Sequence, residues 1–276
     1  MTDLSTHTYR LEGLSVGSYG TCIMLPTMGV ALDMGRCPEP AVHFDTVLLS
    51  HGHIDHIGGL GHHCARRELM RLTPPTYVMA PNLVEPVEAL MAAYRALDGS
   101  KLPYTPVVVE PGDEYQTAKG HIVRPFQSYH VVPSQGYGIW SMKRKLLPEF
   151  HGLPGKQIAK LRQEGVEVSA VVETPEVAWT SDTRPDVVDA EEVVRTARLL
   201  IMEATFLDSR VSAIKARRTF HTHLDDIIEL ERRFQNEEIV LTHFSMRYTF
   251  SEAVAILLER LPVGLRERLA FLPDRG

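Results

Sequence analysis

The chain has 276 residues, of which 44% are hydrophobic, and a formal net charge of −6. This length and apolar content suit one large or two small domains, and no linker-like or low-complexity run divides them, so we expect a single domain over residues 1–276. The acidic balance argues against broad, nonspecific nucleic-acid binding, which usually requires a basic surface, but it leaves room for a local basic patch.

No apolar run has the length of a signal peptide or of a membrane span, so we expect no membrane partner and a cytoplasmic location. The three cysteines, Cys22, Cys37 and Cys64, are widely spaced and odd in number. In a reducing compartment we expect them to be buried thiols.

Short β-branched or apolar segments alternate with helical patterns along the chain. The segments that indicate strands are 29–34, 46–49, 76–79, 107–109, 121–126, 137–141, 177–180, 199–203 and 238–242. Helical patterns cover 59–72, 83–97, 156–164, 191–197, 223–234 and 251–261, the last with Ser251 at the N-cap. The alternation predicts a layered α/β fold.

Residues 50–59 form the most informative motif. Three histidines and one aspartate fall within six residues, directly after the apolar run 46–49. Imidazole and carboxylate are the ligands that zinc prefers. His51 and His53 can converge on one metal, while Asp55 and His56 can turn to a second. The spacing therefore predicts a metal site rather than a structural polar loop.

This H-x-H-x-D-H motif resembles the metallo-β-lactamase superfamily, whose fold is a four-layer αβ/βα sandwich with the metal site along one edge. In that family the remaining ligands are a His, an Asp and a His at later strand ends, and the chain has His130, Asp182 and His243 in that order. We expect two divalent metal ions, zinc in first place with manganese or iron as alternatives. His51, His53 and His130 would hold one metal, Asp55, His56 and His243 the other, and Asp182 would bridge them.

Five later segments resemble ribonuclease Z, the endonuclease that trims the 3′ end of precursor tRNA. They are 130–137, 181–185, 203–206, 220–222 and 241–248, in the order of that family. The resemblance implies a phosphodiesterase that uses a metal-bound hydroxide, and it also implies a homodimer. Asp55 would orient the water, and His221, steered by Glu203, would protonate the leaving 3′ oxygen.

Several assignments stay open. Glu203 could instead be paired elsewhere. Arg184 and Arg247 follow metal ligands and could bind substrate phosphate, or could hold the ligand loops through salt bridges. The one dense basic run, residues 143–145, is better explained as solvated surface than as a nucleic-acid contact. Asp33 matches an early Asp of the superfamily that supports the metal loop.

One region departs from ribonuclease Z. That family carries a long arm that clamps tRNA, whereas only 42 residues, 138–179, lie between Tyr137 and Thr180. We therefore expect a shortened or lost arm and weak binding of precursor tRNA. The leading interpretation is a ribonuclease Z-like enzyme. The alternatives are a related hydrolase of a small phosphodiester or other small ester, and a non-enzymatic binding or scaffold protein.

Overall fold

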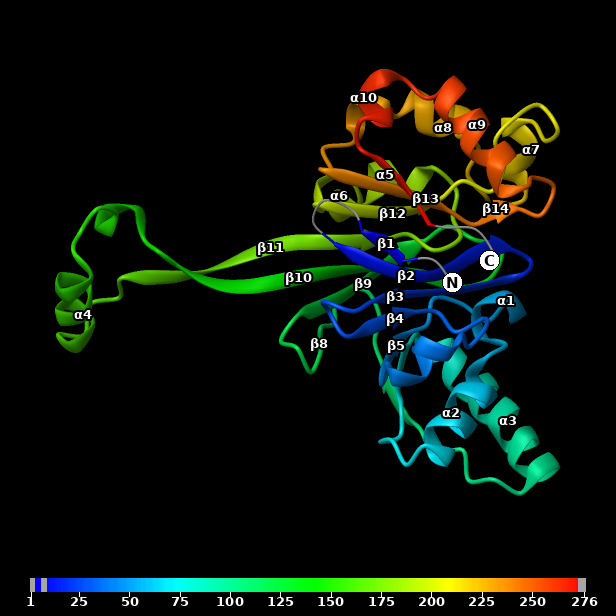
Figure 1. The fold of residues 1–276 in the computed structure, drawn as a ribbon, viewed down its shortest axis with the longest axis horizontal. Coiled ribbons are helices and arrows are strands. Elements are labelled where there is room, and N and C mark those ends of the chain that lie inside the picture. Colours follow the sequence, from blue (N-terminus) through cyan, green and yellow to red (C-terminus); the bar gives the residue numbers. More distant parts are fainter. Residues whose placement is uncertain (1–2, 6–8, 273–276) are drawn as a thin grey trace.

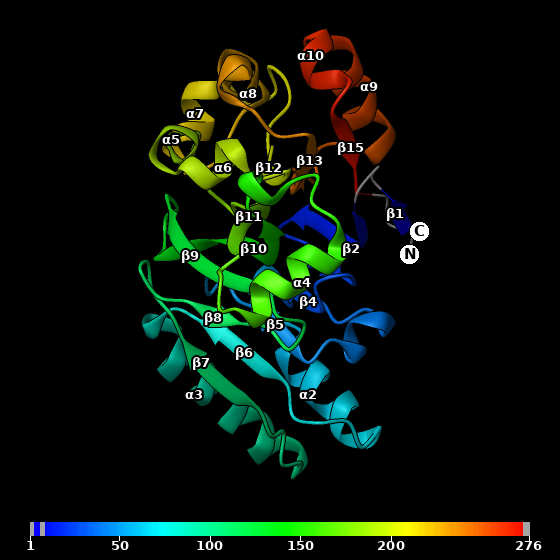
Figure 2. The same ribbon diagram turned by 90° about the vertical axis from the view of Figure 1, so that its left-hand side faces the viewer.

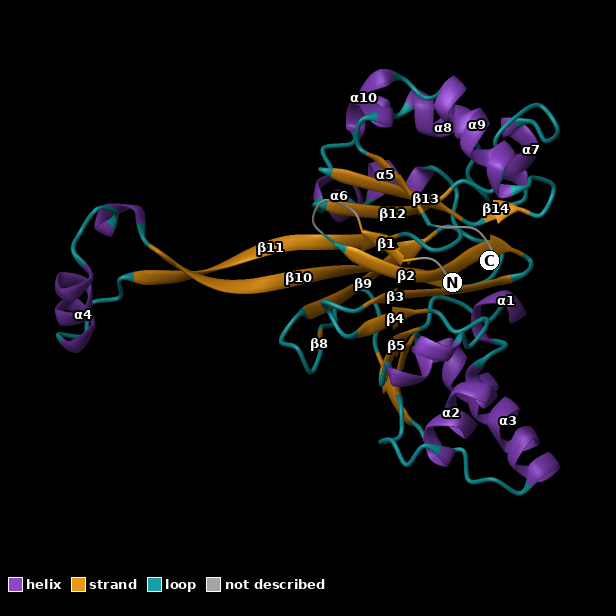
Figure 3. Ribbon diagram, in the orientation of Figure 1, coloured by secondary structure: helices purple, strands orange, loops and turns teal. Residues whose placement is uncertain are grey.

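The computed structural model describes residues 3–5 and 9–272. Two mixed β-sheets pack face to face, and helices cover the outer face of each (Figures 1 and 3). This is the four-layer αβ/βα sandwich predicted from the sequence, and the prediction of the fold is confirmed. No helix among these residues is long and apolar enough to cross a membrane.

The first sheet has the strand order β1-β2-β3-β4-β5-β6-β7, with β14 paired to β2. Its strands are β1 (Asp3–Ser5), β2 (Arg10–Gly17), β3 (Gly20–Leu25), β4 (Val30–Leu32), β5 (Thr46–Leu48), β6 (Thr76–Met79), β7 (Thr105–Val108) and β14 (Phe244–Ser245). The helices beside it are η1 (Glu39–His43), α1 (Ile54–Ile57), α2 (Leu60–Leu69) and α3 (Pro81–Asp98).

The second sheet has the order β15-β13-β12-β11-β10-β9-β8. Its strands are β8 (Tyr115–Gln116), β9 (Ile122–Ser128), β10 (Ser134–Leu146), β11 (Ser169–Trp179), β12 (Leu199–Glu203), β13 (Glu238–Thr242) and β15 (Leu269–Phe271). The helices on this side are α5 (Asp186–Ala190), α6 (Glu192–Thr196), α7 (Ala213–Arg218), α8 (Leu224–Glu229), η3 (Glu231–Arg233), α9 (Phe250–Arg260) and α10 (Val263–Arg266).

The core explains why the central strands are apolar without interruption. In β12, Leu199 and Ile201 pack between the two sheets, whereas Leu200 and Met202 pack against the outer helices. A strand buried on both faces has no solvent side, so it reads as a continuous apolar run rather than an alternating one. The two sheets are thereby held at a fixed spacing, and their strand ends meet along one edge.

Three local expectations need correction. The last long helix begins at Phe250 with Thr249 as its N-cap in a capping box with Glu252, so Ser251 is not the cap. The expected helix 223–234 is divided into α8 and η3. Strands β2 and β3 were not predicted, because β2 reads as Gly- and Ser-containing sequence although its side chains alternate between buried and half-buried.

The arm is present, so the expectation of a lost arm is wrong, and whether it is shorter than in the family stays a prediction. Strands β10 and β11 pair from Tyr137 with Trp179 out to Leu146 with Ser169. They extend from the body as a long hairpin that carries η2 (Pro148–Phe150) and α4 (Gly155–Gln163) at its end (Figure 1), and Figure 2 looks along it. A strand rises about 3.3 Å per residue, so the 13 residues of β10 alone span roughly 40 Å. A segment of 42 residues is therefore long enough for an arm.

We expect the body to fold without the arm, because nearly all residues between Lys143 and Ala170 are exposed or half-buried and none belongs to a core cluster. Met142 and Glu173 are cross-strand partners, so a two-residue type I′ turn can join them. The melting temperature of this arm-deleted variant, measured by calorimetry, should lie within about 4 °C of the intact protein. A fall of more than about 10 °C would contradict this.

Candidate metal centre and active site

The candidate site lies where strand ends from both sheets meet. His51 and His53 follow β5 of the first sheet, Asp55 and His56 lie in α1 beside it, and His130 follows β9 of the second sheet. From the second sheet, Asp182 follows β11, Glu203 ends β12 and His243 follows β13. Residues separated by almost 200 positions in the chain are thereby brought to one edge of the sandwich.

His51, His53, His130 and Asp182 form one group of possible ligands. The Nδ1 atom of His53 lies 3.1 Å from Nε2 of His51 and 3.2 Å from Nε2 of His130. One ligand atom from each of the four residues lies within 4.8 Å of all the others. Imidazole nitrogens this close are expected to share a cation, because they cannot all donate to one another.

Asp55, His56 and His243 form a second group. Oδ2 of Asp55 lies 3.7 Å from Nε2 of His243 and 3.9 Å from Nε2 of His56. The carboxylate of Asp182 connects the two groups: Oδ1 lies 3.3 Å from Nε2 of His243, and Oδ2 lies 3.4 Å from Nε2 of His56 and 3.9 Å from Nε2 of His130. Its position suits a carboxylate shared by two cations.

Buried polar atoms at the site fit divalent metal ions. Nε2 of His56 and Nε2 of His243 are both buried, and neither has a hydrogen-bond partner among the described residues. Burial lowers the pKa of His51, His53 and His130, which favours the neutral imidazole that binds metals. Burial opposes ionisation of Asp182, but His243 and His56 outweigh it and hold its pKa well below the usual range. His51, His53 and His130 therefore offer neutral imidazole, and Asp182 offers an ionised carboxylate.

Asp33 orients His56 directly and His51 through Ser50, on the side of each ring that faces away from the site. Oδ2 of this buried aspartate lies 2.5 Å from Nδ1 of His56. Ser50 donates to both Asp33 oxygens, from its backbone N–H at 2.8 Å and its hydroxyl at 2.7 Å, and Oγ of Ser50 lies 3.0 Å from Nδ1 of His51. Because Nδ1 of each ring is engaged here, Nε2 is left to face the centre.

Glu203 and His221 form a pair beside the metal ligands. Nδ1 of His221 lies 2.9 Å from Oε1 of Glu203, which is buried. Burial lowers the pKa of His221, but the Glu203 carboxylate outweighs it and raises this pKa to about 9. The sequence left open whether Glu203 is paired elsewhere, and the structure pairs it with His221.

Thr205 connects this pair to the metal ligands, which the sequence did not reveal. Its hydroxyl donates to Oε2 of Glu203 at 2.5 Å and accepts from Nδ1 of His243 at 3.1 Å. His130 is fixed similarly, with Nδ1 3.1 Å from the carbonyl oxygen of Phe220. A threonine hydroxyl and a backbone carbonyl carry no sequence signature of this role, so only the fold identifies them.

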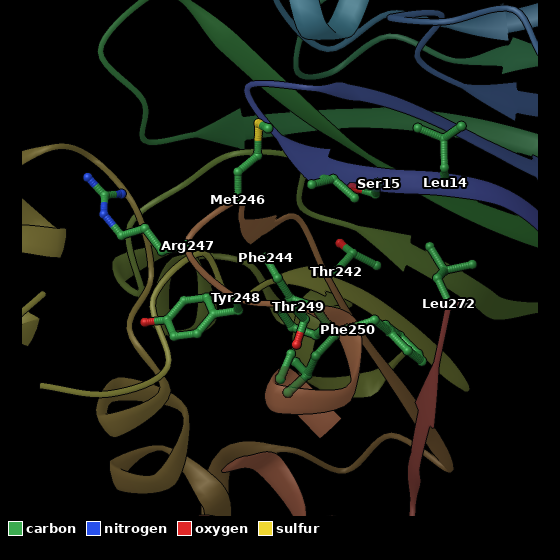
Figure 4. A pocket seen from close by; sticks show the side chains of 13 residues that line it. Leu14, Ser15, Thr242, Phe244, Met246, Arg247, Tyr248, Thr249, Phe250 and Leu272 are labelled. Carbon is green, nitrogen blue, oxygen red and sulfur yellow. The ribbon is translucent and has the colours of Figure 1, made fainter. Parts of the chain in front are cut away.

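The two arginines considered for substrate binding lie in different surroundings. Arg184 forms an ion pair with Asp186, Nε to Oδ2 at 3.1 Å, and its guanidinium lies 5.4 Å from the ring centre of Phe220, next to His221. Arg247 donates to the Ser245 hydroxyl at 3.1 Å and lines a cavity of about 390 Å³ that includes none of the seven candidate ligands. In Figure 4 its guanidinium extends away from the other side chains of that cavity.

The sequence model of the family described as "Beta-lactamase superfamily domain" matches residues 30–244. Among curated proteins, tRNase Z TRZ1 of Arabidopsis thaliana is 41% identical over 266 residues, which is 96% of this chain and 95% of that protein. Among solved structures, the metallo-β-lactamase fold protein YhfI from Bacillus subtilis has a TM-score of 0.64 at 14% identity over 96% of each chain. The short form of human tRNase Z has a TM-score of 0.58 at 17% identity over 94% of each chain. The chain therefore belongs to the β-lactamase superfamily and, within it, to the tRNase Z (ribonuclease Z) family of metal-dependent hydrolases.

Proposed function

We propose that this protein is a two-metal phosphodiesterase that cleaves precursor tRNA at its 3′ end. The observation that carries the proposal is the position of Asp182, whose carboxylate faces histidines of both ligand groups. The Glu203–His221 pair lies beside the same ligands. The similarity to a tRNase Z over nearly the whole chain supports tRNA as the substrate class.

The proposed ligands are those predicted from the sequence. His51, His53 and His130 would hold one cation, Asp55, His56 and His243 would hold the other, and Asp182 would serve both. Zinc is the first choice, because imidazole and carboxylate donors suit it, and manganese or iron are alternatives. Two such cations supply a water of lowered pKa and neutralise the charge that develops on the phosphate.

His221 is the proposed general acid. Its Nδ1 is directed at Glu203, which fixes the ring orientation and favours the protonated form, so Nε2 is available to protonate the leaving 3′ oxygen. Asp55, in the second group of candidate ligands, would orient the attacking water. Arg184 and Arg247 are the proposed contacts for the substrate phosphate. The guanidinium of Arg184 lies over Phe220, which precedes His221, and that of Arg247 lies over Phe206, whose ring packs against the His221 ring.

The arm supports a large nucleic-acid substrate. From residue 142 to residue 170 it contains six Lys and Arg against three Glu, in a chain whose net charge is −6. Lys143 and Arg144 have side chains 66% and 67% exposed, and their ion pairs, at 3.9 and 3.4 Å, are loose. This local basic surface removes the main argument for the alternative of a small phosphodiester substrate. It also removes the basis for expecting weak binding of precursor tRNA.

Three further expectations from the sequence remain predictions. They are a single domain over residues 1–276, a homodimer, and a cytoplasmic location. Sedimentation equilibrium of the purified protein measures the second directly, and a mass of one chain would contradict it.

Metal content tests the ligand assignment. We expect about two metal ions per chain after reconstitution with zinc, measured by elemental analysis. Asp182→Ala should reduce this to one or fewer, because the shared ligand is removed. The matched control is His151→Ala, which changes an exposed histidine of the arm and should retain both ions. One ion or none in the unmodified protein would contradict the proposal.

The general acid is tested by leaving-group dependence. His221→Ala should lower kcat on precursor tRNA by about 10²–10⁴-fold, because the 3′ oxygen then departs unprotonated. The loss should shrink on a nitrophenyl phosphodiester, whose leaving group needs little protonation. Metal content should be unchanged. Equal losses on both substrates would contradict the assignment as general acid. Loss of metal would show that His221 is a ligand, an alternative that its position near Asp182 and His243 supports.

The role of the arm is tested by salt dependence. Changing Lys143, Arg144 and Lys145 together to alanine should weaken binding of precursor tRNA and reduce the slope of log Kd against log salt concentration by about 2–3, if each contacts one phosphate. Turnover of the nitrophenyl phosphodiester should be unaffected, and Lys101→Ala, at an exposed lysine outside the arm, should retain full binding. An unchanged slope would place the RNA on another surface.

A further inference from the structure

The turn between β2 and β3 reaches the metal centre through its backbone. The N–H of Ser18 donates to Oδ2 of Asp55 at 2.8 Å. This is the same oxygen that faces Nε2 of His243 and Nε2 of His56. The turn therefore fixes the carboxylate oxygen that would bind the second cation. A movement of the turn would displace this oxygen of Asp55.

The turn adopts a conformation that is unfavourable for its sequence. Ser18 has a φ of +61°, in the left-handed region where a residue with a Cβ atom is strained. Tyr19 N–H donates to the carbonyl of Val16 at 3.0 Å, which closes the turn. A strained conformation of this kind persists only where surrounding groups hold it in place.

Arg36 contacts the turn in three ways. Its Nε donates to the carbonyl oxygen of Tyr19 at 2.9 Å, and its guanidinium carbon lies 3.8 Å from the centre of the Tyr19 ring. Its side chain also passes directly over Gly20, where an added Cβ would come within 2.7 Å of Cγ of Arg36. The side chain thus contacts the carbonyl, the ring and the backbone of the two residues that follow Ser18.

The backbone beside Arg36 also contacts the segment that carries Asp55. At Gly35 an added Cβ would lie 1.7 Å from the carbonyl oxygen of Asp55, so the two backbones pack directly against each other. The N–H of Gly35 donates to the carbonyl of Thr21 in β3 at 2.8 Å. Gly35 and Arg36 together therefore connect the turn to the segment carrying Asp55.

We propose that Arg36 is a positioning residue for Asp55. It holds the β2–β3 turn in the left-handed conformation that presents the Ser18 N–H to Oδ2 of Asp55. Without Arg36 the turn relaxes, this hydrogen bond is lost, and Asp55 binds the second cation and orients the water less well. The inference rests on the proposed function, in which Asp55 is a ligand of a two-metal hydrolase.

The test compares Arg36→Ala and Arg36→Lys with Arg232→Ala, a control at an exposed arginine of η3. Zinc is titrated into metal-free protein against a chromogenic chelator. Groups that orient metal ligands typically change metal affinity or activity 10–100-fold, so Arg36→Ala should weaken one of the two zinc sites about 10–100-fold and leave the other unchanged. Arg36→Lys keeps the charge but lacks the planar N–H fork, so it should recover only part of the loss. Arg232→Ala should match the unmodified protein.

Kinetics separate positioning from substrate binding. Arg36→Ala should lower kcat on both the nitrophenyl phosphodiester and precursor tRNA by about 10–100-fold, with KM for precursor tRNA nearly unchanged, and added guanidinium should restore part of kcat. A raised KM with unchanged kcat would show that Arg36 binds substrate, and unchanged zinc affinities would also overturn the proposal. Equal weakening of both zinc sites with a lower melting temperature would indicate a purely structural role.

The unmodified protein, measured in parallel, distinguishes failure of the inference from failure of the proposed function. If it binds two zinc ions and cleaves the nitrophenyl diester but not precursor tRNA, only the tRNA assignment fails and the test of Arg36 stands. If it binds a single zinc ion, the two-metal proposal fails together with the inference.

Discussion

The buried carboxylate of Asp182 lies between histidines that come from both sheets, so the site requires the two sheets to pack in one arrangement. Asp182 is 3% exposed, and its two oxygens face His56, His130 and His243. A buried carboxylate is unfavourable unless positive charge lies beside it, and a carboxylate with imidazole nitrogens around both oxygens is typical of a metal centre. The ligands come from both sheets, and the two sheets must therefore pack at a fixed spacing for the centre to exist.

Backbone strain is concentrated around this centre. Among the described residues, seven other than glycine have a positive φ, and five of these lie at the site: Ser18, Asp33, Ser181, Phe220 and His243. Left-handed backbone costs about 1–2 kcal/mol for such residues, so a stable fold concentrates it only where geometry demands it. Here each strained residue is, or directly adjoins, a group that binds or orients a candidate ligand. The hydrogen bonds of Asp33, Ser50, Thr205 and Glu203 offset part of the free-energy cost of this strained backbone.

The arm differs from the body of the protein in both charge and shape. The body has an acidic excess, while the hairpin of β10 and β11 carries a basic excess away from it (Figure 1). A basic element remote from the reacting bond adds affinity for a polyanion without altering the chemistry at the metals. The body and the arm therefore suit two separate tasks, hydrolysis and retention of a large substrate.

The sequence predicted the layered fold, which the structure confirms, and the candidate metal ligands, because both follow from local patterns and from the resemblance to a known family. The H-x-H-x-D-H spacing and the apolar strands that precede the candidate ligands can be recognised in the sequence. The pairing of Glu203 with His221 is only implied by the resemblance, and the structure supplies it. The remaining features depend on how distant segments pack together. The arm extends from the body because β10 and β11 pair along their length, and the number of residues in the segment does not reveal this pairing. The roles of Thr205, Phe220 and the Ser18 N–H depend on a hydroxyl or backbone atoms that any sequence contains, and they become specific only when distant segments are packed together.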